Sequence, residues 1–312
     1  MAATGEFAHL PQDVRPVAAL DAQARIMHIR AERWVQHAAA ERVLGYLQEA
    51  STQPRRERME NILLIGESGM GKTMLIRKFE RQALPGFDDA TGVQQVPVVV
   101  MLMPPQPTET AFFAQLLKAL NAPSPGHFTY SFPSRETALR LLHQLGTRVV
   151  VIDEINSVLS GTPRQQRVFL QLLRFLSNEL QLAFVGVGVP EARHALLSDS
   201  QLRSRFTDIE LPPWSVGEDL RDFVTRLTWS LPLREPSPVD SPKLRRLLVD
   251  RTGGVTLGIC KVLERAAIKA IQDGTERISM ESLAEPEIWR GVATPARDTR
   301  AQARSGPARQ KE

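Results

Sequence analysis

Short, fully apolar segments alternate with amphipathic segments along the middle of this chain. An apolar run that ends in turn residues is typical of a strand buried on both faces, as in a parallel sheet covered by helices. The predicted strands cover residues 61–65, 96–102, 148–152, 183–187 and, with a shorter pattern, 208–211. Helical periodicity fills most of the intervals. The pattern therefore predicts a mainly parallel, five-stranded α/β sheet between helices.

The predicted helices share an apolar stripe at helical spacing. They cover residues 21–50 ahead of the first strand, and 73–82, 110–120, 136–144 and 165–180 between the strands. After Pro212-Pro213 only helical periodicity remains, at residues 217–231, 243–251 and 258–272. We therefore expect a small all-helical lid domain after the α/β domain.

These patterns divide the chain into four expected parts. They are an N-terminal extension and helix (1–55), the α/β domain (56–212), the helical lid domain (213–290) and a basic tail (291–312). The tail is rich in Ala, Arg, Pro and Gln and has no apolar periodicity. Such a composition is typical of disorder.

Charge changes this picture little. The net charge is +4, and the tail contributes five basic against two acidic residues, so the folded body is nearly neutral. Overall charge is therefore a weak indicator of nucleic-acid binding, although a local basic patch stays possible. With 42% hydrophobic residues, the 312-residue chain can bury a substantial core.

The chain has no apolar run long enough to span a membrane and no secretory signal at its N-terminus. Its one cysteine, Cys260, cannot form an internal disulfide and is expected to be a small buried apolar residue. These features favour a cytoplasmic protein.

The first predicted strand runs into a loop with the pattern G-x-x-x-x-G-K-[ST]. Its residues are Gly66, Glu67, Ser68, Gly69, Met70, Gly71, Lys72 and Thr73. Glycines let backbone N–H groups converge on phosphate oxygens, and the following helix directs its positive end at the same anion. Lys72 would contact the β- and γ-phosphates, and the Thr73 hydroxyl is a suitable ligand for Mg²⁺. The loop therefore predicts an ATP site.

Two acids end the third strand of the pattern. Asp153 and Glu154 follow four apolar residues, which places them at the carboxyl edge of the sheet, beside the phosphate loop. Asp153 is expected to hold the Mg²⁺ shell, and Glu154 to orient or deprotonate the attacking water. The double acid favours an ATPase of the AAA+ kind over a GTPase.

Two arginines lie between the fourth and fifth strands. In ring or filament ATPases, an arginine at this place reaches the γ-phosphate of the neighbouring subunit. Arg205 is the first candidate and Arg203 the second, with a surface ion pair as the alternative.

These residues together resemble the TniB proteins, the AAA+ transposition regulators related to TnsC. The stretches that carry the resemblance are residues 33–34, 58–73, 149–192, 199–214 and 231–237, within a span of about 10–285. The helix after the acid pair and the segment around Arg205 are more specific to the family than the phosphate loop is.

The resemblance implies a function that composition does not. Proteins of this kind bind double-stranded DNA with little sequence preference when they hold ATP, and they assemble on it as a homo-oligomer, a ring or a filament. They present the target to a DDE transposase of TniA type and to a TniQ-type adaptor. ATP hydrolysis disassembles the oligomer, so the protein would lie on the nucleoid when it is bound to DNA.

Two positions depart from the general AAA+ pattern. The fourth strand ends at Gly188 without the polar side chain that usually senses the γ-phosphate. Leu257 stands where many relatives have a second sensor arginine, and Lys261 or Arg265 are possible substitutes. Both gaps predict slow hydrolysis, well below tens of turnovers per second.

The DNA-contacting residues are not visible in the sequence. Arg164, Arg167 and Arg174 follow the acid pair on one helix, where a solvated face is the favoured interpretation. The insert at 104–133 and the tail stay open as DNA contacts, and Trp34 as a neighbour of the adenine. The six histidines and Cys260 show no metal-ligand spacing, so Mg²⁺ is the one metal expected.

Two other functions remain as alternatives. An initiator or helicase loader of the same superfamily would need a winged-helix domain after the helical domain, for which the chain is expected to be too short. A signalling or chaperone-like ATPase scaffold would assemble and turn over ATP without DNA.

Overall fold

The computed structural model describes residues 7–89, 92–122, 131–196 and 203–292. The chain forms two compact units. One joins the residues up to Glu32 with those from Trp214 onward, and the other is Arg33–Pro213. The N-terminal part expected at 1–55 is therefore divided between the two units. The basic tail expected at 291–312 lies outside the described residues, apart from its first two.

The Arg33–Pro213 unit contains the predicted sheet. Its strands run in the order β4-β5-β6-β1-β7, and every neighbouring pair is parallel. Their bounds are β1 (Asn61–Gly66), β4 (Val98–Leu102), β5 (Val149–Asp153), β6 (Ala183–Gly188) and β7 (Phe206–Leu211). The prediction of a five-stranded parallel sheet is confirmed.

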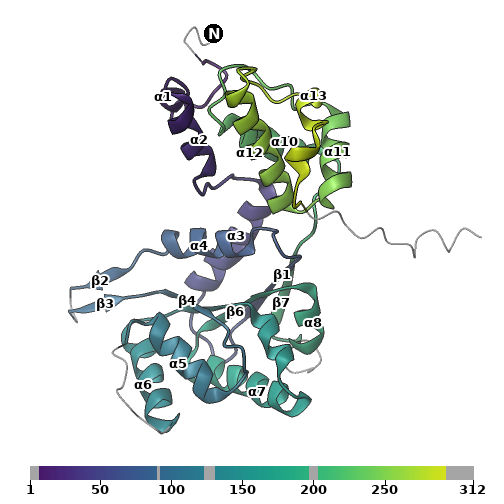
Figure 1. The fold of residues 1–312 in the computed structure, drawn as a ribbon. Coiled ribbons are helices and arrows are strands. Elements are labelled where there is room, and N and C mark those ends of the chain that lie inside the picture. Colours follow the sequence, from purple (N-terminus) through teal and green to yellow (C-terminus); the bar gives the residue numbers. More distant parts are fainter. Residues whose placement is uncertain (1–6, 90–91, 123–130, 197–202, 293–312) are drawn as a thin grey trace, which may run out of the picture. The chain divides into compact units, whose positions relative to one another are not determined.

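Helices cover both faces of this sheet. They are α3 (Ala38–Thr52), α4 (Lys72–Gln82), α5 (Glu109–Ala119), α6 (Ser131–Gln144), α7 (Pro163–Leu180) and α8 (Pro190–Leu196), with the 3₁₀ helix η1 (Ile155–Ser160) after β5. Figure 1 shows α3 and α4 on one face and α5, α6 and α7 on the other. On the second face Phe112 makes edge-to-face contacts with Phe113 and Phe169, each with ring centroids 5.5 Å apart.

The register brings the carboxyl ends of four strands, β4, β5, β6 and β1, together at one edge of the sheet. Leu102 pairs with Asp153, Ile152 with Gly186, and Ile65 with Gly188. In a parallel sheet the carboxyl ends share an edge, and that edge is where open α/β sheets bind ligands. The phosphate loop, the acid pair and the end of β6 therefore lie close together.

The helix predicted over 21–50 is two helices. The first is α2 (Ala22–Arg30), capped by Asp21, whose side chain accepts a hydrogen bond from Ala24 N at 2.8 Å. Residues 31–37 form neither helix nor strand, and α3 begins after His37. The break coincides with the division between the units: Ile26 and Ile29 are buried in one core, Val43 and Leu47 in the other.

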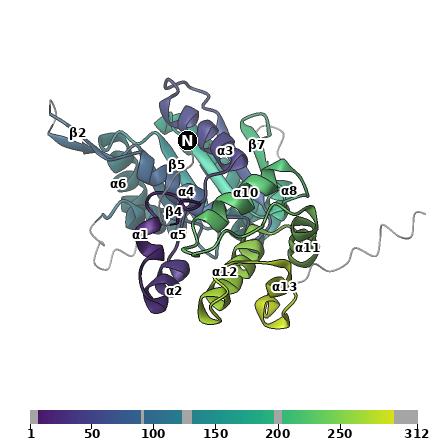
Figure 2. The ribbon, with the colours of Figure 1, turned by 90° about the horizontal axis from the view of Figure 1, so that it is seen from above.

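An antiparallel hairpin was not predicted. It consists of β2 (Gly86–Asp88) and β3 (Val93–Gln95), between α4 and β4. Figures 1 and 2 both show it extending away from the five-stranded sheet. Phe87 is 65% exposed, so this hairpin is not held by a core of its own.

The second unit is helical, as expected for the segment after Pro213. Its elements are α1 (Arg15–Ala18), α2, α10 (Glu218–Trp229), α11 (Pro242–Thr252), α12 (Thr256–Gln272), α13 (Met280–Leu283) and the 3₁₀ helix η2 (Pro286–Trp289). The central helix α12 buries Ile259, Val262, Leu263 and Ala266. Cys260 on this helix is half-buried. None of the described helices has the length and apolar character needed to cross a membrane.

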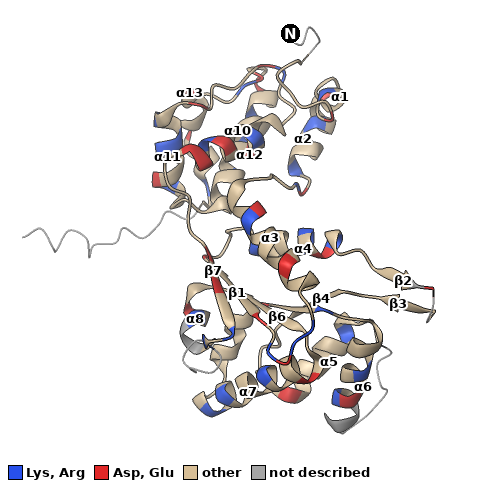
Figure 3. Ribbon diagram, turned by 180° about the vertical axis from the view of Figure 1, so that it is seen from behind, with Lys and Arg blue, Asp and Glu red and all other residues tan. Residues whose placement is uncertain are grey.

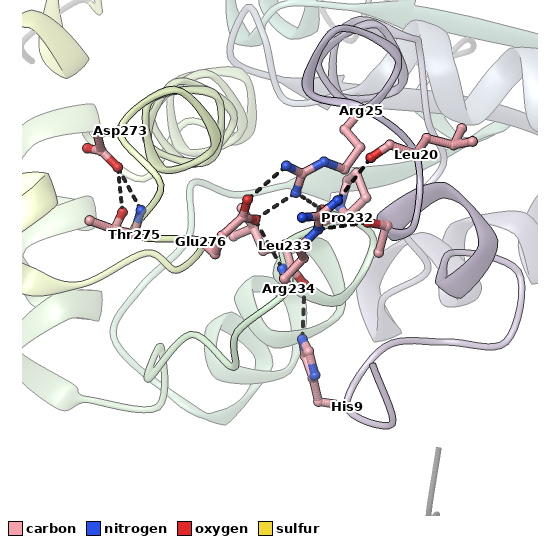
Figure 4. A network of polar contacts seen from close by, with 10 residues as sticks. His9, Leu20, Arg25, Pro232, Leu233, Arg234, Asp273, Thr275 and Glu276 are labelled. Carbon is pink, nitrogen blue, oxygen red and sulfur yellow. Dashed lines mark hydrogen bonds and ion pairs between the residues drawn. The ribbon is translucent and has the colours of Figure 1, made fainter. Parts of the chain in front are cut away.

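A buried ion pair attaches the N-terminal segment to this helical unit (Figure 4). The Arg25 guanidinium, 3% exposed, donates to both carboxylate oxygens of Glu276 at 2.6 and 2.8 Å. Arg234 donates to the carbonyls of Ala18 at 3.1 Å and Leu20 at 3.2 Å. The described residues up to Glu32 are thus part of the helical unit.

Glu276→Gln is expected to lower the free energy of unfolding at pH 7 by about 3 kcal/mol, because it leaves the buried Arg25 without a counter-charge. Burial raises the pKa of Glu276, but the hydrogen bonds from Arg25 and Arg234 outweigh it and hold the pKa below the ordinary 4.5. The stabilisation from the carboxylate is therefore complete above pH 4.5 and is lost as the pH falls through the lowered pKa.

Urea unfolding of the full chain at pH 7 and at successively lower pH measures this effect. The difference between wild type and Glu276→Gln should shrink below pH 4.5, whereas the exposed neighbour Glu235 should change little when replaced by Gln. A loss of stability that is equal at every pH would contradict the ion pair as its cause.

Candidate functional site

The loop between β1 and α4 has the backbone of an anion cradle. Gly69 and Gly71 adopt φ of +80° and +90°, which side-chain-bearing residues rarely do. Gly71 is the N-cap of α4 and provides no side chain to accept hydrogen bonds from the first amides of the helix. These N–H groups and the positive end of the helix are therefore available to an anion.

Gly66 is required for a different reason. A β-carbon at this position would lie 2.9 Å from the carbonyl oxygen of Leu211 and 3.2 Å from its β-carbon. The first glycine of the motif thus lets β1 and β7 approach each other where the loop begins. The sequence pattern alone did not indicate this contact.

The Lys72 side chain folds back over the loop. Its ammonium donates to the carbonyls of Gly66 at 2.6 Å and Glu67 at 2.9 Å, and the residue is 9% exposed. Burial lowers the pKa of Lys72, while the carboxylates of Glu154, Asp153 and Glu67 oppose that shift. The loop carbonyls therefore hold the Lys72 cation beside the uncapped N–H groups that begin α4, and both are groups that attract phosphate oxygens.

Thr73 and Asp153 come together from two separate elements. The Thr73 hydroxyl donates to Asp153 Oδ2 at 2.9 Å, and Asp153 Oδ1 accepts from the backbone N of Glu154 at 2.9 Å. A hydroxyl and a carboxylate are hard oxygen ligands, and Mg²⁺ typically takes one or two of these with water and substrate phosphates completing its shell. The donor set fits Mg²⁺. Elsewhere in the described chain, no cluster of three or more His, Cys, Asp or Glu residues offers a metal site.

Glu154 is exposed and stands at a sharp bend of the backbone. Its φ of +56° and ψ of +40° are left-handed, a conformation that costs a residue with a side chain about 1–3 kcal/mol. The bend ends β5 and starts η1. The Glu154 Oε2 accepts a hydrogen bond from Asn156 Nδ2 at 3.1 Å. Asn156 was not among the predicted site residues, although it follows Glu154 by two positions.

The two sensor positions differ in what surrounds them. The end of β6 is buried through Gly188 and presents no polar side chain, as the sequence indicates. Lys261 and Arg265 belong to the helical unit. Lys261 is exposed, and Arg265 donates to the carbonyl of Ile288 at 3.0 Å, so its guanidinium has partners within that unit.

Arg203 and Arg205 lie at the opposite edge of the sheet from the phosphate loop. The carbonyl of Arg205 accepts from Asn61 N at 2.8 Å, and Asn61 is the first residue of β1. A six-residue strand spans about 17 Å, so Arg205 is far from the loop of its own chain. Its guanidinium donates to Asn178 Oδ1 at 2.5 Å.

The surroundings of Arg205 are basic. Burial lowers the pKa of Arg205, and so do the charges of Arg58 and Arg174. Arg58 in turn donates to Ser204 Oγ at 2.6 Å. Three arginines thus gather near the amino end of β7, an arrangement that favours a negatively charged group from outside this unit.

The other predicted candidates are more dispersed. Arg164 and Arg167 are exposed on the first turns of α7, whose arginines Figure 3 shows in blue, whereas Arg174 is half-buried near Arg205. The Trp34 ring faces Lys78 of α4, with Nζ 6.0 Å from the ring centroid. Residues 123–130 of the insert expected at 104–133 lie outside the described chain.

Solved structures of ORC and Cdc6p proteins have the same fold. The ORC2 protein of Aeropyrum pernix in ADPNP-ADP complexes matches with a TM-score of 0.59 at 15% identity, covering 88% of this chain and 73% of that chain. The ORC1 protein of Aeropyrum pernix in complex with DNA gives 0.57 at 20% identity, covering 83% and 67%. Cdc6p of Pyrobaculum aerophilum gives 0.55 at 17%, covering 81% and 68%. This likeness confirms the predicted AAA+ fold class.

The family follows from a second comparison. The model of the family described as bacterial TniB protein matches residues 25–216, which is more than half of the chain. This protein belongs to the TniB family, as the sequence resemblance predicted. No curated protein sequence gives a significant match. The matched range contains the phosphate loop, the acid pair, and both Arg203 and Arg205.

Proposed function

We propose that this protein is an ATP-dependent regulator of transposition that assembles on DNA and is released from it by ATP hydrolysis. The observation that carries the proposal is the Thr73–Asp153 hydrogen bond in a TniB-family chain, because it unites the phosphate loop with the acid pair. The DNA bound to the ORC1 protein is a ligand of that protein, and it makes DNA the first ligand to test here.

In the proposed reaction the loop binds the phosphates of ATP. Backbone N–H groups at the start of α4 and the Lys72 ammonium offset the negative charge on the β- and γ-phosphates. Thr73 and Asp153 would hold Mg²⁺, which would supply further positive charge beside the phosphates. Glu154 accepts a proton from water as the water oxygen bonds to the γ-phosphorus and the bond to the β-phosphate oxygen breaks.

Hydrolysis on this proposal is a timer for assembly. Homo-oligomers, whether rings or filaments, would form on double-stranded DNA in the ATP state and dissociate after hydrolysis. β6 ends at Gly188 without a polar side chain, and the Arg265 guanidinium is hydrogen-bonded within the helical unit. Both features support slow turnover, below tens per second. A DDE transposase of TniA type and a TniQ-type adaptor are the proposed partners of the assembled form.

ATP is expected to strengthen binding to a random-sequence DNA duplex at least tenfold relative to ADP, because only the γ-phosphate state assembles. Fluorescence anisotropy and electron microscopy with ATP, ADP and a non-hydrolysable ATP analogue measure this. Lys72→Ala should abolish the ATP effect, whereas the exposed Lys118 on α5, replaced by Ala, should preserve it.

The same experiment separates the other functions. Binding that is absent in every nucleotide state at moderate salt would overturn the DNA-based mechanism. If ATP still drove assembly without DNA, a signalling or chaperone-like scaffold would become the better proposal. Stable binding that requires one particular sequence would instead favour an initiator.

A further inference from the structure

The Asn156 side chain links the acid pair to the end of β6. Its Nδ2 donates to Glu154 Oε2 at 3.1 Å. Its Oδ1 is buried and finds no hydrogen-bond partner among the described residues. One end of the amide therefore holds Glu154, and the other is directed into the protein.

Gly188 shows what the buried end of the amide touches. A β-carbon on Gly188 would lie 3.0 Å from Asn156 Oδ1 and 2.9 Å from Ile155 Cγ2. Ile155 is buried in the core, so it cannot move aside freely. The space that a side chain at the end of β6 would fill is thus already occupied by the residues after Glu154.

This place is close to the phosphate loop. Gly188 pairs with Ile65, the residue before Gly66, in the parallel register of β1 and β6. Asn156 therefore brings a polar group to the point where β6 itself has none. The amide belongs to η1, which follows β5, and it donates its hydrogen bond to Glu154, the second residue of the acid pair.

The orientation of the amide is fixed by Glu154. A carboxylate accepts hydrogen bonds and cannot donate them, so the NH₂ group of Asn156 must face it. The amide oxygen must then face Ile155 and Gly188, where it is buried without a donor. A buried acceptor without a partner lowers stability, and such groups in folded proteins are often retained at functional positions.

We propose that Asn156 is the positioning residue of Glu154, at the place where β6 has no polar side chain of its own. The amide holds the Glu154 carboxylate in one orientation toward the attacking water. Gly188 keeps open the space in which the amide lies. The proposal rests on the proposed ATP hydrolysis, since it concerns the residue that accepts the proton.

Asn156→Asp tests the hydrogen bond with little change of size. Aspartate keeps the shape of asparagine but has no NH₂ group, and it places a second carboxylate beside Glu154. We expect kcat for Mg-ATP to fall at least tenfold. KM and the Kd for ATP should stay within twofold, because Asn156 makes no contact with the phosphate loop in the described hydrogen bonds. A purely structural role would lower folding and binding together.

Gly188→Ala tests the shared space. The added methyl group should displace the Asn156 amide and lower kcat as Asn156→Ala does. The double variant Asn156→Ala with Gly188→Ala should then fall no further than either single variant, because both remove the same interaction. Ser157→Ala, in the same turn, is the matched control and should keep the wild-type kcat.

The assays use the full-length protein with DNA present, and thermal unfolding checks that each variant folds. A kcat for Asn156→Asp within twofold of wild type would overturn the role of Asn156, and so would additive losses in the double variant. If the wild type hydrolysed ATP no faster than Lys72→Ala, the proposed hydrolysis itself would be overturned. If the wild type hydrolyses ATP and Asn156→Asp is equally active, the proposed hydrolysis is retained and only the positioning role of Asn156 is rejected.

Discussion

Glu154→Gln is expected to lower ATP turnover by about 10³-fold, within the range that a positioned general base contributes. Glutamine has the shape of glutamate but cannot accept the proton of the attacking water. The Thr73–Asp153 hydrogen bond and the Lys72 contacts with the loop do not involve the Glu154 side chain. ATP binding should therefore persist while hydrolysis nearly stops.

The DNA complex gives this variant a second readout. If hydrolysis ends the assembly, Glu154→Gln should stay on DNA with ATP far longer than wild type, as measured by dissociation after dilution. Glu179→Gln, an exposed acid on α7, is the control for the loss of a negative charge. Turnover near the wild-type rate in Glu154→Gln would contradict its role as the base.

The sheet was predictable because its central strands are buried on both faces. Val149 to Ile152 of β5 are all 1% exposed or less, and a strand of this kind has a continuous apolar sequence. The hairpin β2–β3 gave no such signal. Its strands have three residues each, and its large apolar side chain Phe87 is exposed. The periodicity of apolar residues in a sequence indicates which side chains are buried, and this hairpin buries few apolar side chains.

The helix over 21–50 was mispredicted for a related reason. Helical periodicity shows that apolar residues share a face, but it does not show which core that face joins. Ile29 is packed in the helical unit and Leu47 in the α/β unit, so the chain must leave the helical path between them. The partner of Arg25 was equally hidden, since Glu276 is 251 positions away.

The candidate site could be predicted from the sequence where its residues form a contiguous motif. The phosphate loop and the acid pair each occupy neighbouring positions, and the chemistry of each is defined by residue type and spacing. Asn156 and Gly188 form a pair only through the packing of η1 against β6. The absence of a polar side chain at the end of β6 was visible in the sequence, but the position of Asn156 beside Gly188 was not.

Arg205→Ala is expected to reduce DNA-stimulated ATP hydrolysis by about 10³-fold while ATP binding persists, as for an arginine that stabilises the transition state from a neighbouring subunit. The position of Arg205 motivates this expectation. It lies at the amino edge of the sheet, where Arg58 and Arg174 add positive charge and burial lowers its pKa. At that edge it cannot serve the phosphate loop of its own chain.

Mixing two inactive variants tests whether this arginine acts between subunits. Lys72→Ala lacks a working site but keeps Arg205, and Arg205→Ala keeps its site but lacks the arginine. In a head-to-tail assembly with equal amounts of both, about a quarter of the interfaces would combine the intact site with the intact arginine. Hydrolysis should therefore recover to about that fraction of the wild-type rate.

Arg203→Ala is the matched control, because Arg203 is exposed two residues earlier and lies before the same strand. It should keep most of the hydrolysis if Arg205 is the acting residue. If Arg203→Ala instead loses activity and is rescued by Lys72→Ala, the transition-state role passes to Arg203. The mixture could also stay inactive while both variants still assemble on DNA. That result would show that the arginine acts within one chain and that assembly does not control hydrolysis.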